Sequence, residues 1–140
     1  MPMNDLNILA LVLATIGQFA VGFVWYGPLF GKLWGQIHGF DKLSEKVQKE
    51  MMSKMGPWYA LQLLVTFVTT VVLAKLLIVV PDYSPYALAV MVWIGFVVPT
   101  QVSAVIFGGT EPEWMIKKMA VQAGASLACL LAAAAILTAF

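Results

Sequence analysis

Four long apolar stretches limit most strongly what this chain can fold into. They cover residues 7–26, 58–80, 86–107 and 119–140, and Lys75 is the only charged side chain in any of them. An α-helix rises about 1.5 Å per residue, so about 20 residues cross a hydrocarbon core of about 30 Å. We therefore predict an all-α fold: a polytopic membrane protein whose four transmembrane helices form a single domain.

The composition supports this prediction and narrows the partners. Hydrophobic residues make up 61% of the 140 residues and charged residues only 11%, whereas soluble domains carry about 25% charged residues. A domain of this size cannot bury so many apolar side chains, so the expected partner of much of the chain is the lipid bilayer. All eight basic residues are lysines, without the arginine fork that grips phosphates and guanines, so we expect no nucleic-acid partner.

The lysines indicate how the chain is oriented in the membrane. Seven of the eight lie in residues 27–57 and 108–118, and basic loops are retained on the cytoplasmic side. We therefore predict that both segments are cytoplasmic loops and that the N-terminus and C-terminus lie outside. Lys75 falls near the outer end of its stretch, where a long side chain can place its ammonium at the membrane surface.

The first of these loops contains a pattern typical of a short amphipathic helix. Between lysines and glutamates, apolar side chains recur every four residues at Leu43, Val47, Met51 and Met55. We predict a helix over 41–55 that is capped by Asp41, ends at Gly56 and Pro57, and lies on the inner membrane surface. The alternative is that its apolar stripe covers the ends of the transmembrane helices.

Proline positions should interrupt two of the transmembrane helices. Gly27 and Pro28 are predicted to end the first helix, because proline lacks a backbone donor and disfavours helix in the residue before it. Pro99 should kink the third helix and free the carbonyl of Gly95, which must find another partner. We interpret this kink as a static bend rather than a hinge.

Uncharged polar side chains recur within the apolar stretches, with one glutamine in each. They have two interpretations: a polar path or pocket in the cytoplasmic half of the bundle, or hydrogen bonds between helices. We favour hydrogen bonds, because an amide that faces lipid lacks a partner. The predicted polar cluster comprises Gln18, Gln62, Thr66, Thr69, Thr70, Thr100, Gln101, Gln122 and Ser126.

Small residues form a ridge along the last stretch. They recur every four residues, a spacing that lets two helix backbones approach closely where lipid offers no hydrophobic driving force. The ridge is predicted to pack within the monomer or between subunits, against glycines of the first and third helices. The ridge residues are Ala120, Gly124, Ala128 and Ala132, and the receiving glycines are Gly17, Gly22 and Gly95.

The sequence predicts neither an enzyme nor a cofactor. His38 is the only histidine and Cys129 the only cysteine, whereas zinc sites require several ligands, so we expect no metal site. No nucleophile elbow, phosphate-binding loop or pair of catalytic carboxylates occurs. The four stretches contain no Asp or Glu, which disfavours proton-coupled transport because such transport commonly relies on an intramembrane carboxylate.

One run of the sequence resembles a known membrane family. Residues 22–34, which read GFVWYGPLFGKLW, are similar to the signature of the domain of unknown function 1761 family. The third stretch, with Trp93, Gly95, Pro99 and Phe107, is also similar to that family's pattern. The resemblance implies four transmembrane helices in a small membrane protein and brings no established activity or catalytic residues. The alanine-rich final helix departs from the expected pattern.

These observations support two hypotheses of different classes. The leading one is a self-associating membrane protein that forms a passive pathway for a small solute or ion. The alternative is an accessory or assembly subunit that packs against a larger membrane complex and transports nothing. A closed polar cluster, together with an apolar surface complementary to something other than itself, would favour the alternative.

Overall fold

The computed structural model describes residues 6–140, and these residues form helices joined by short turns, without a strand. The topology prediction also names a side of the membrane for the N-terminus, which lies outside the described residues. The helices are α1 (Ile8–Val24), η2 (Trp25–Leu29), α2 (Gly31–Ile37), η3 (Phe40–Lys42), α3 (Glu45–Ser53), α4 (Gly56–Val79), α5 (Pro85–Val92), η4 (Trp93–Val97), α6 (Val98–Phe107), η5 (Pro112–Trp114) and α7 (Met115–Ala139).

Four helical segments of the described chain are long and apolar enough to cross a membrane. They are Ile8–Leu29, Gly56–Val79, Pro85–Phe107 and Pro112–Ala139, each close to a predicted stretch. The structure therefore confirms the all-α class and the four membrane-capable helices.

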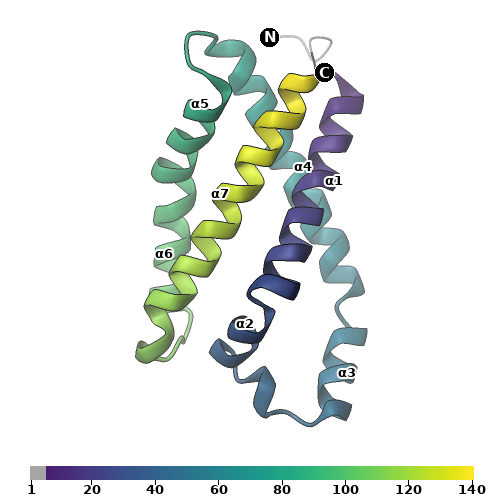
Figure 1. Cartoon of the computed structure of the whole chain (residues 1–140), viewed down its shortest axis with the longest axis vertical. Helices are drawn as coiled ribbons and strands as arrows, with labels where there is room; N and C mark the ends of the chain where they lie inside the picture. Colours follow the sequence, from purple (N-terminus) through teal and green to yellow (C-terminus); the bar gives the residue numbers. More distant parts are fainter. Residues whose placement is uncertain (1–5) are drawn as a thin grey trace.

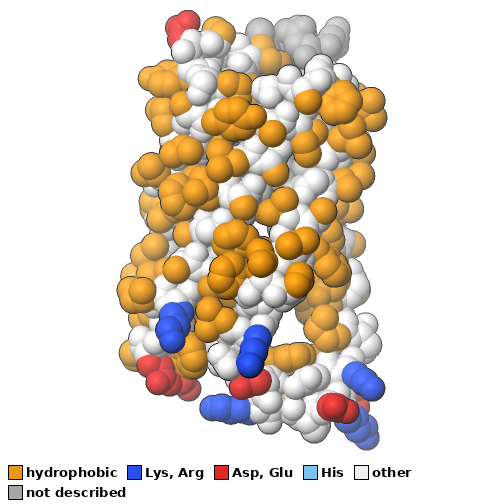
Figure 2. All heavy atoms as spheres, viewed as in Figure 1, with side chains coloured by type: hydrophobic (Ala, Val, Ile, Leu, Met, Phe, Trp, Pro, Cys, Tyr) orange, Lys and Arg blue, Asp and Glu red, His pale blue; other side chains and the backbone are white. Residues whose placement is uncertain are grey.

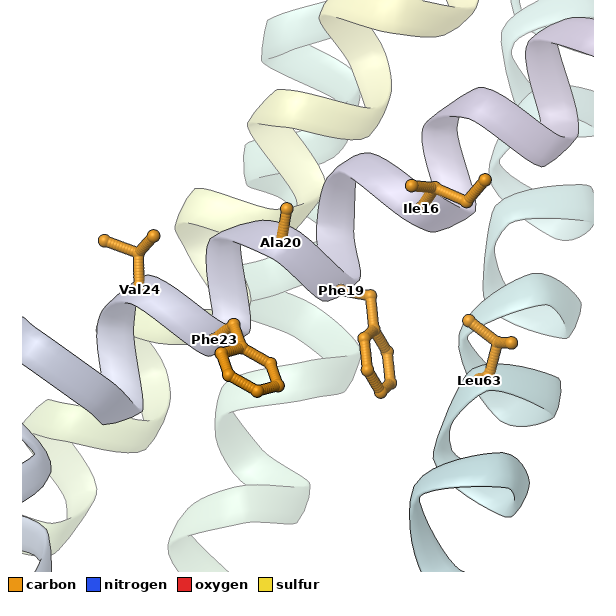
Figure 3. A pocket seen from close by; sticks show the side chains of 6 residues that line it. All are labelled: Ile16, Phe19, Ala20, Phe23, Val24 and Leu63. Carbon is orange, nitrogen blue, oxygen red and sulfur yellow. The ribbon is translucent and has the colours of Figure 1, made fainter. Parts of the chain in front are cut away.

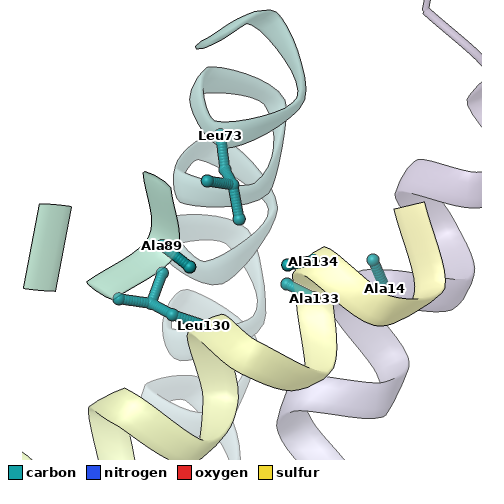
Figure 4. Close-up of a cluster of buried hydrophobic side chains, with 6 residues drawn as sticks. All are labelled: Ala14, Leu73, Ala89, Leu130, Ala133 and Ala134. Carbon is teal, nitrogen blue, oxygen red and sulfur yellow. The ribbon is translucent and has the colours of Figure 1, made fainter. Parts of the chain in front are cut away.

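Helix α7 occupies the centre of the bundle, and the other long helices pack around it (Figure 1). It lies diagonally between α1 on one side and α5 with α6 on the other, while α4 packs mainly on α1. The central contact between these helices uses small side chains, which let backbones approach closely. Its buried residues, shown in Figure 4, are Ala14, Leu73, Ala89, Leu130, Ala133 and Ala134.

The loop before α4 differs from the predicted single helix over 41–55. A 3₁₀ turn covers Phe40–Lys42, and α3 begins only at Glu45. Ser44 caps α3, because its Oγ accepts from the backbone N–H of Val47 at 3.3 Å, so the prediction that Asp41 is the cap is wrong. The reason is that Leu43 and Ser44 have extended backbones, which separate Asp41 from the helix.

Both proline sites produce π-helical turns. At the first, η2 contains Pro28 and the N–H of Phe30 donates to the carbonyl of Trp25, five residues earlier. The first membrane-capable segment ends at Leu29 and the chain turns at Phe30 before α2 begins, so the segment ends one residue after Pro28, and Gly27 and Pro28 lie in its last turn. The extra residue in a π turn keeps most backbone groups bonded around the missing proline donor.

The second site has the same geometry. The N–H of Val98 donates to the carbonyl of Trp93, and Pro99 then lies in the first turn of α6, where a helix leaves its N–H groups unpaired. The predicted distortion near Pro99 is therefore a π turn over Trp93–Val97 that begins six residues before the proline.

Most charged side chains visible in Figure 2 gather at one end of the molecule, one acidic side chain lies at the opposite end, and the flank between them is largely apolar. The charged end comprises α2, α3 and the connection from α6 to α7, whereas the start of α1 and the C-terminus lie at the opposite end (Figure 1). The fold thus brings both lysine-rich segments to the same end of the bundle.

Candidate functional site

The first intramembrane polar contact joins α1 to α4. Gln18 Nε2 donates to Thr70 Oγ1 at 2.6 Å and to the carbonyl oxygen of Ala14, one turn earlier, at 3.1 Å. Gln18 is only 5% exposed and Thr70 is completely buried. Because Thr70 Oγ1 itself donates to the carbonyl of Thr66 at 2.7 Å, the hydroxyl acts as acceptor and donor at once. The contact holds two helices together and faces no solvent.

The second contact joins α7 to the third membrane-capable segment. Ser126 Oγ on α7 lies 3.1 Å from Gln101 Oε1 and 3.0 Å from the carbonyl oxygen of Ala123, either of which can accept its proton. Trp93 Nε1 donates to the same Ala123 carbonyl at 2.8 Å and lies 3.1 Å from Ser126 Oγ. Two predicted cluster residues, Gln101 and Ser126, are therefore joined directly, and Trp93, which was not predicted to take part, adds a bond to the same part of α7.

A second tryptophan makes the equivalent contact from the first segment. Trp25 Nε1 donates to the carbonyl oxygen of Val121 on α7 at 3.0 Å. Like Trp93, Trp25 begins a π turn and uses its indole N–H on the backbone of α7. An indole N–H in a lipid environment needs an acceptor, and a helix carbonyl has a spare lone pair to offer.

A short sequence pattern that occurs twice marks the two tryptophans, Trp25 and Trp93. Val24-Trp25-Tyr26-Gly27 and Val92-Trp93-Ile94-Gly95 share the pattern V-W-x-G, each followed by a proline within four residues of the glycine. Sequence reasoning missed it because the two copies lie at different depths of their stretches, one at the end and one near the middle. Because α7 is tilted, its Val121 carbonyl lies beside Trp25 and its Ala123 carbonyl lies beside Trp93.

The remaining members of the predicted polar cluster lie apart from these contacts. Gln62 and Thr69 are exposed on α4, and Thr100 is exposed on α6, where its hydroxyl donates to the carbonyl of Phe96 at 2.8 Å. Thr66 is half-buried and accepts from Gln62 Nε2 at 3.3 Å within the same helix, and Gln122 is half-buried on α7. Four of the nine residues thus form two contacts between helices, and Gln62, Thr66 and Thr69 form a largely exposed strip on α4. Thr100 and Gln122 belong to neither, so the nine residues do not form one polar path.

Of the four glycines predicted to lie in close helix contacts, two lie close to a side chain of another helix and two do not. A Cβ on Gly17 would lie 2.5 Å from Ile136 Cδ1, and one on Gly124 would lie 2.6 Å from the ring of Trp25, so α1 and α7 approach closely at both. Gly22 and Gly95 have nothing within 4 Å of that position among the described residues.

The ridge on α7 is not its most buried face. Ala120 is exposed, and Gly124, Ala128 and Ala132 are half-buried. The buried residues of α7 are Val121, Ala125, Leu130, Ala133 and Ala134. The face that packs is therefore rotated from the predicted one, toward both α1 and α5.

An open apolar groove of about 430 Å³ separates the lower part of α1 from α4 (Figure 3). Phe19 and Phe23 project from α1 toward Leu63 on α4, with Ile16, Ala20 and Val24 completing the lining. The groove exists because α4 packs against α1 only through its second half: every residue from 56 to 65 is exposed. One side of the bundle is therefore open to lipid or to another helix.

The chain matches one known family. A model described as Protein of unknown function (DUF1761) matches residues 9–138, from α1 almost to the end of α7. The chain belongs to the DUF1761 family. The match confirms the resemblance drawn from residues 22–34 and includes both tryptophan contacts of α7. No curated protein and no solved structure matches the chain.

The chemistry of the intramembrane contacts is that of hydrogen bonding between helices. Within residues 6–140, no three His, Cys, Asp or Glu side chains gather where they could share a metal ion. Cys129 Sγ lies 3.5 Å from the carbonyl oxygen of Gln18, so it also contacts α1. These groups position α1 and the third segment relative to α7, and α4 relative to α1.

Proposed function

We propose that this DUF1761 chain is a non-enzymatic integral membrane protein that self-associates through the exposed half of α4. The observation that carries the proposal is the exposure of every residue from 56 to 65, a stretch that includes the amide of Gln62. An apolar helix face is stable against lipid, but an amide there is not, because each unsatisfied polar group in hydrocarbon costs several kcal/mol.

The hydrogen bonds of Gln62 leave capacity for a partner. Within the described chain its side chain makes one bond, from Nε2 to Thr66 Oγ1 at 3.3 Å on its own helix. A side-chain amide has two donor hydrogens and an oxygen with two lone pairs, so most of this capacity is unused. A second copy related by a two-fold axis would bring Gln62 opposite Gln62, and the two amides would satisfy each other.

Any passive pathway for a small solute or ion would then lie between copies. The amides of Gln18 and Gln101 are engaged with Thr70 and Ser126 inside the chain, which argues against their lining a water-filled path. The largely exposed strip of Gln62, Thr66 and Thr69 on α4 provides polar groups that two copies would share.

The same proposal places the molecule in the membrane. The end with residues 27–57 and 108–118 faces the cytoplasm because it holds seven lysines, and the C-terminus faces outside. Leu43, Val47 and Met51 are exposed on or beside α3, so their apolar stripe is free to lie on the inner membrane surface.

The test is the mass of the protein in a non-ionic detergent, with Gln62→Leu as the variant. We expect a homodimer, and we expect Gln62→Leu to weaken dimerisation about thirtyfold, since two symmetry-related bonds of about 1 kcal/mol each are lost. Gln122→Leu is the matched control, an amide on α7 away from the strip, and should leave the mass unchanged.

The opposite results are equally informative. A strictly monomeric wild-type protein, or a dimer unaffected by Gln62→Leu, would contradict the proposal. A single copy that purifies in fixed proportion with a different membrane protein would instead support the accessory-subunit hypothesis.

A further inference from the structure

A polar cavity lies at the lysine-rich end, away from the α4 strip. It has a volume of about 270 Å³ and is enclosed by the turn after α2, the connection from α6 to α7, and the first turns of α7. Its charged and titratable lining residues are His38, Lys42, Glu111 and Lys118. Since one water occupies about 30 Å³ of liquid, the space holds the equivalent of about nine waters, enough for a small polar headgroup.

The cationic groups come from two segments far apart in the sequence. Lys118 Nζ lies 3.4 Å from Thr110 Oγ1 and 5.9 Å from the ring centre of Trp34, so its ammonium is held at the cavity wall. Lys42 lines the same cavity from η3. The Nδ1 of His38 lies 2.9 Å from the carbonyl oxygen of Trp34, which can only accept, so Nδ1 carries a hydrogen and Nε2 remains for a ligand.

Backbone donors add to this cationic wall. Gly108 has φ −92° and ψ 15°, and Gly109 has φ 75°. Successive residues in this right-handed then left-handed order form a concave nest of N–H groups that suits an anionic oxygen.

Negative groups face the same space, and they decide which ligand class fits. Glu111 lines the cavity, and the C-terminal ends of α2 and α6 close on it, each with a partial charge of up to about −0.5. Together these negative groups offset part of the positive charge of the two lysines. Glu111 lines the same cavity as Lys42 and Lys118, so the cavity presents charges of both signs.

We propose that this cavity binds a zwitterionic headgroup that carries a phosphate and a primary ammonium. The phosphate would face Lys42, Lys118 and the Gly108–Gly109 nest, and the ammonium would face Glu111. Trp34 and Trp114 are aromatic residues of the kind that lie at headgroup level, so the cavity opens where a phosphoethanolamine lipid presents this chemistry. Free phosphoethanolamine has the same two groups.

The experiment is native mass spectrometry of the full-length protein in a non-ionic detergent, titrated with short-chain lipids. We expect dioctanoyl phosphatidylethanolamine to bind at least fivefold more tightly than the phosphatidylcholine and phosphatidylglycerol analogues, which lack a primary ammonium. Soluble phosphoethanolamine distinguishes the sources: competition at similar concentration indicates a free ligand, and its failure to compete indicates a lipid. Equal binding of all three lipids would overturn the proposal.

Neighbouring residues provide matched variants. We expect Lys118→Gln to weaken binding of the phosphatidylethanolamine about fivefold, whereas Lys117→Gln, whose ammonium lies 5.0 Å over Trp114 outside the cavity lining, should not. Glu111→Gln should remove the preference over phosphatidylglycerol, and Glu113→Gln, two residues away, should keep it. If each cavity variant behaved like its neighbour, only general surface charge would be involved and the site would be refuted. Lys42→Gln, on an exposed turn, repeats the test if Lys118→Gln fails to fold.

Discussion

At the residue scale, a few polar side chains of the bundle make specific contacts between helices. Gln18 meets Thr70, Gln101 meets Ser126, and two indole N–H groups meet carbonyls of α7. Hydrogen bonds between membrane helices are worth only about 0.6 kcal/mol on average and at most about 1.7 kcal/mol. A few such bonds therefore contribute little to the total stability, and their main effect is to favour one arrangement of the helices over others.

The Gln18–Thr70 contact predicts different effects for two adjacent threonines. Thr69 and Thr70 both donate their hydroxyl to the carbonyl four residues earlier, but only Thr70 also accepts from Gln18. Thr70→Val should lower the free energy of unfolding by about 1 kcal/mol because it leaves a buried amide with one partner fewer. Thr69→Val, at an exposed site, should change it by less than about 0.5 kcal/mol. Thermal unfolding in detergent measures both, and equal effects would contradict the contact.

The indole contacts predict a similar contrast between tryptophans. Trp93→Phe keeps an aromatic ring but removes the N–H that meets the Ala123 carbonyl, so it should destabilise the protein by about 1 kcal/mol or somewhat more with the lost ring volume. Trp58→Phe, 62% exposed near the start of α4, is the control and should be neutral within about 0.5 kcal/mol. The readout is again the unfolding midpoint, and a neutral Trp93→Phe would show that the bond does not contribute.

At the element scale, α7 is the helix that organises the others. It receives Gly17 of α1 against Ile136, and it presents Gly124 to the ring of Trp25. The π turns at η2 and η4 are where the first and third segments reach it. A π turn changes the direction of side chains by inserting one residue, which explains why distortions near the prolines coincide with the two tryptophans.

This packing predicts opposite results for two glycines. Gly124→Ala places a Cβ 2.6 Å from the Trp25 ring, whose position is held by its bond to Val121, so overpacking should cost about 1–3 kcal/mol. Gly22→Ala meets nothing within 4 Å, and alanine is the better helix former by up to about 1 kcal/mol, so it should be neutral or stabilising. A stabilising Gly124→Ala would show that the two helices are farther apart than described.

At the scale of the whole molecule, the two lysine-rich segments meet at one end of a bundle whose long helices alternate in direction (Figure 1). Basic residues are retained on the cytoplasmic side, so this charge difference between the ends predicts which end faces the cytoplasm. The polar cavity of the α2 turn and the α6–α7 connection lies at the same end as the lysines.

The orientation of the chain in the membrane can be tested at two serines that have the same structural role. Ser84 caps α5 and Ser44 caps α3, so a cysteine at either one removes a comparable helix cap. In a Cys129→Ala background, an impermeant thiol reagent outside intact cells should label Ser84→Cys and not Ser44→Cys. Labelling of Ser44→Cys alone would reverse the orientation.

The sequence by itself determined the number of membrane-capable helices, their approximate bounds and the gathering of charge in two connections. Length and charge decide these features, because lipid demands about 20 apolar residues per crossing and excludes lysines from its core. The two proline sites were also evident, and the first segment ends one residue after Pro28, but the π turns that begin at Trp25 and Trp93 were not predicted.

Only the tertiary structure decided which faces meet. In a soluble helix a polar face marks solvent, but here lipid and protein interior are both apolar, so a helix such as α4 shows no pattern that distinguishes its packed half from its open half. Thr69 and Thr70 are identical in the sequence, and shape complementarity with α1 buried one against Gln18 and left the other exposed. The same complementarity placed Gly124 against a tryptophan and left Gly22 and Gly95 without neighbours, because close approach depends on both surfaces and not on one helix alone.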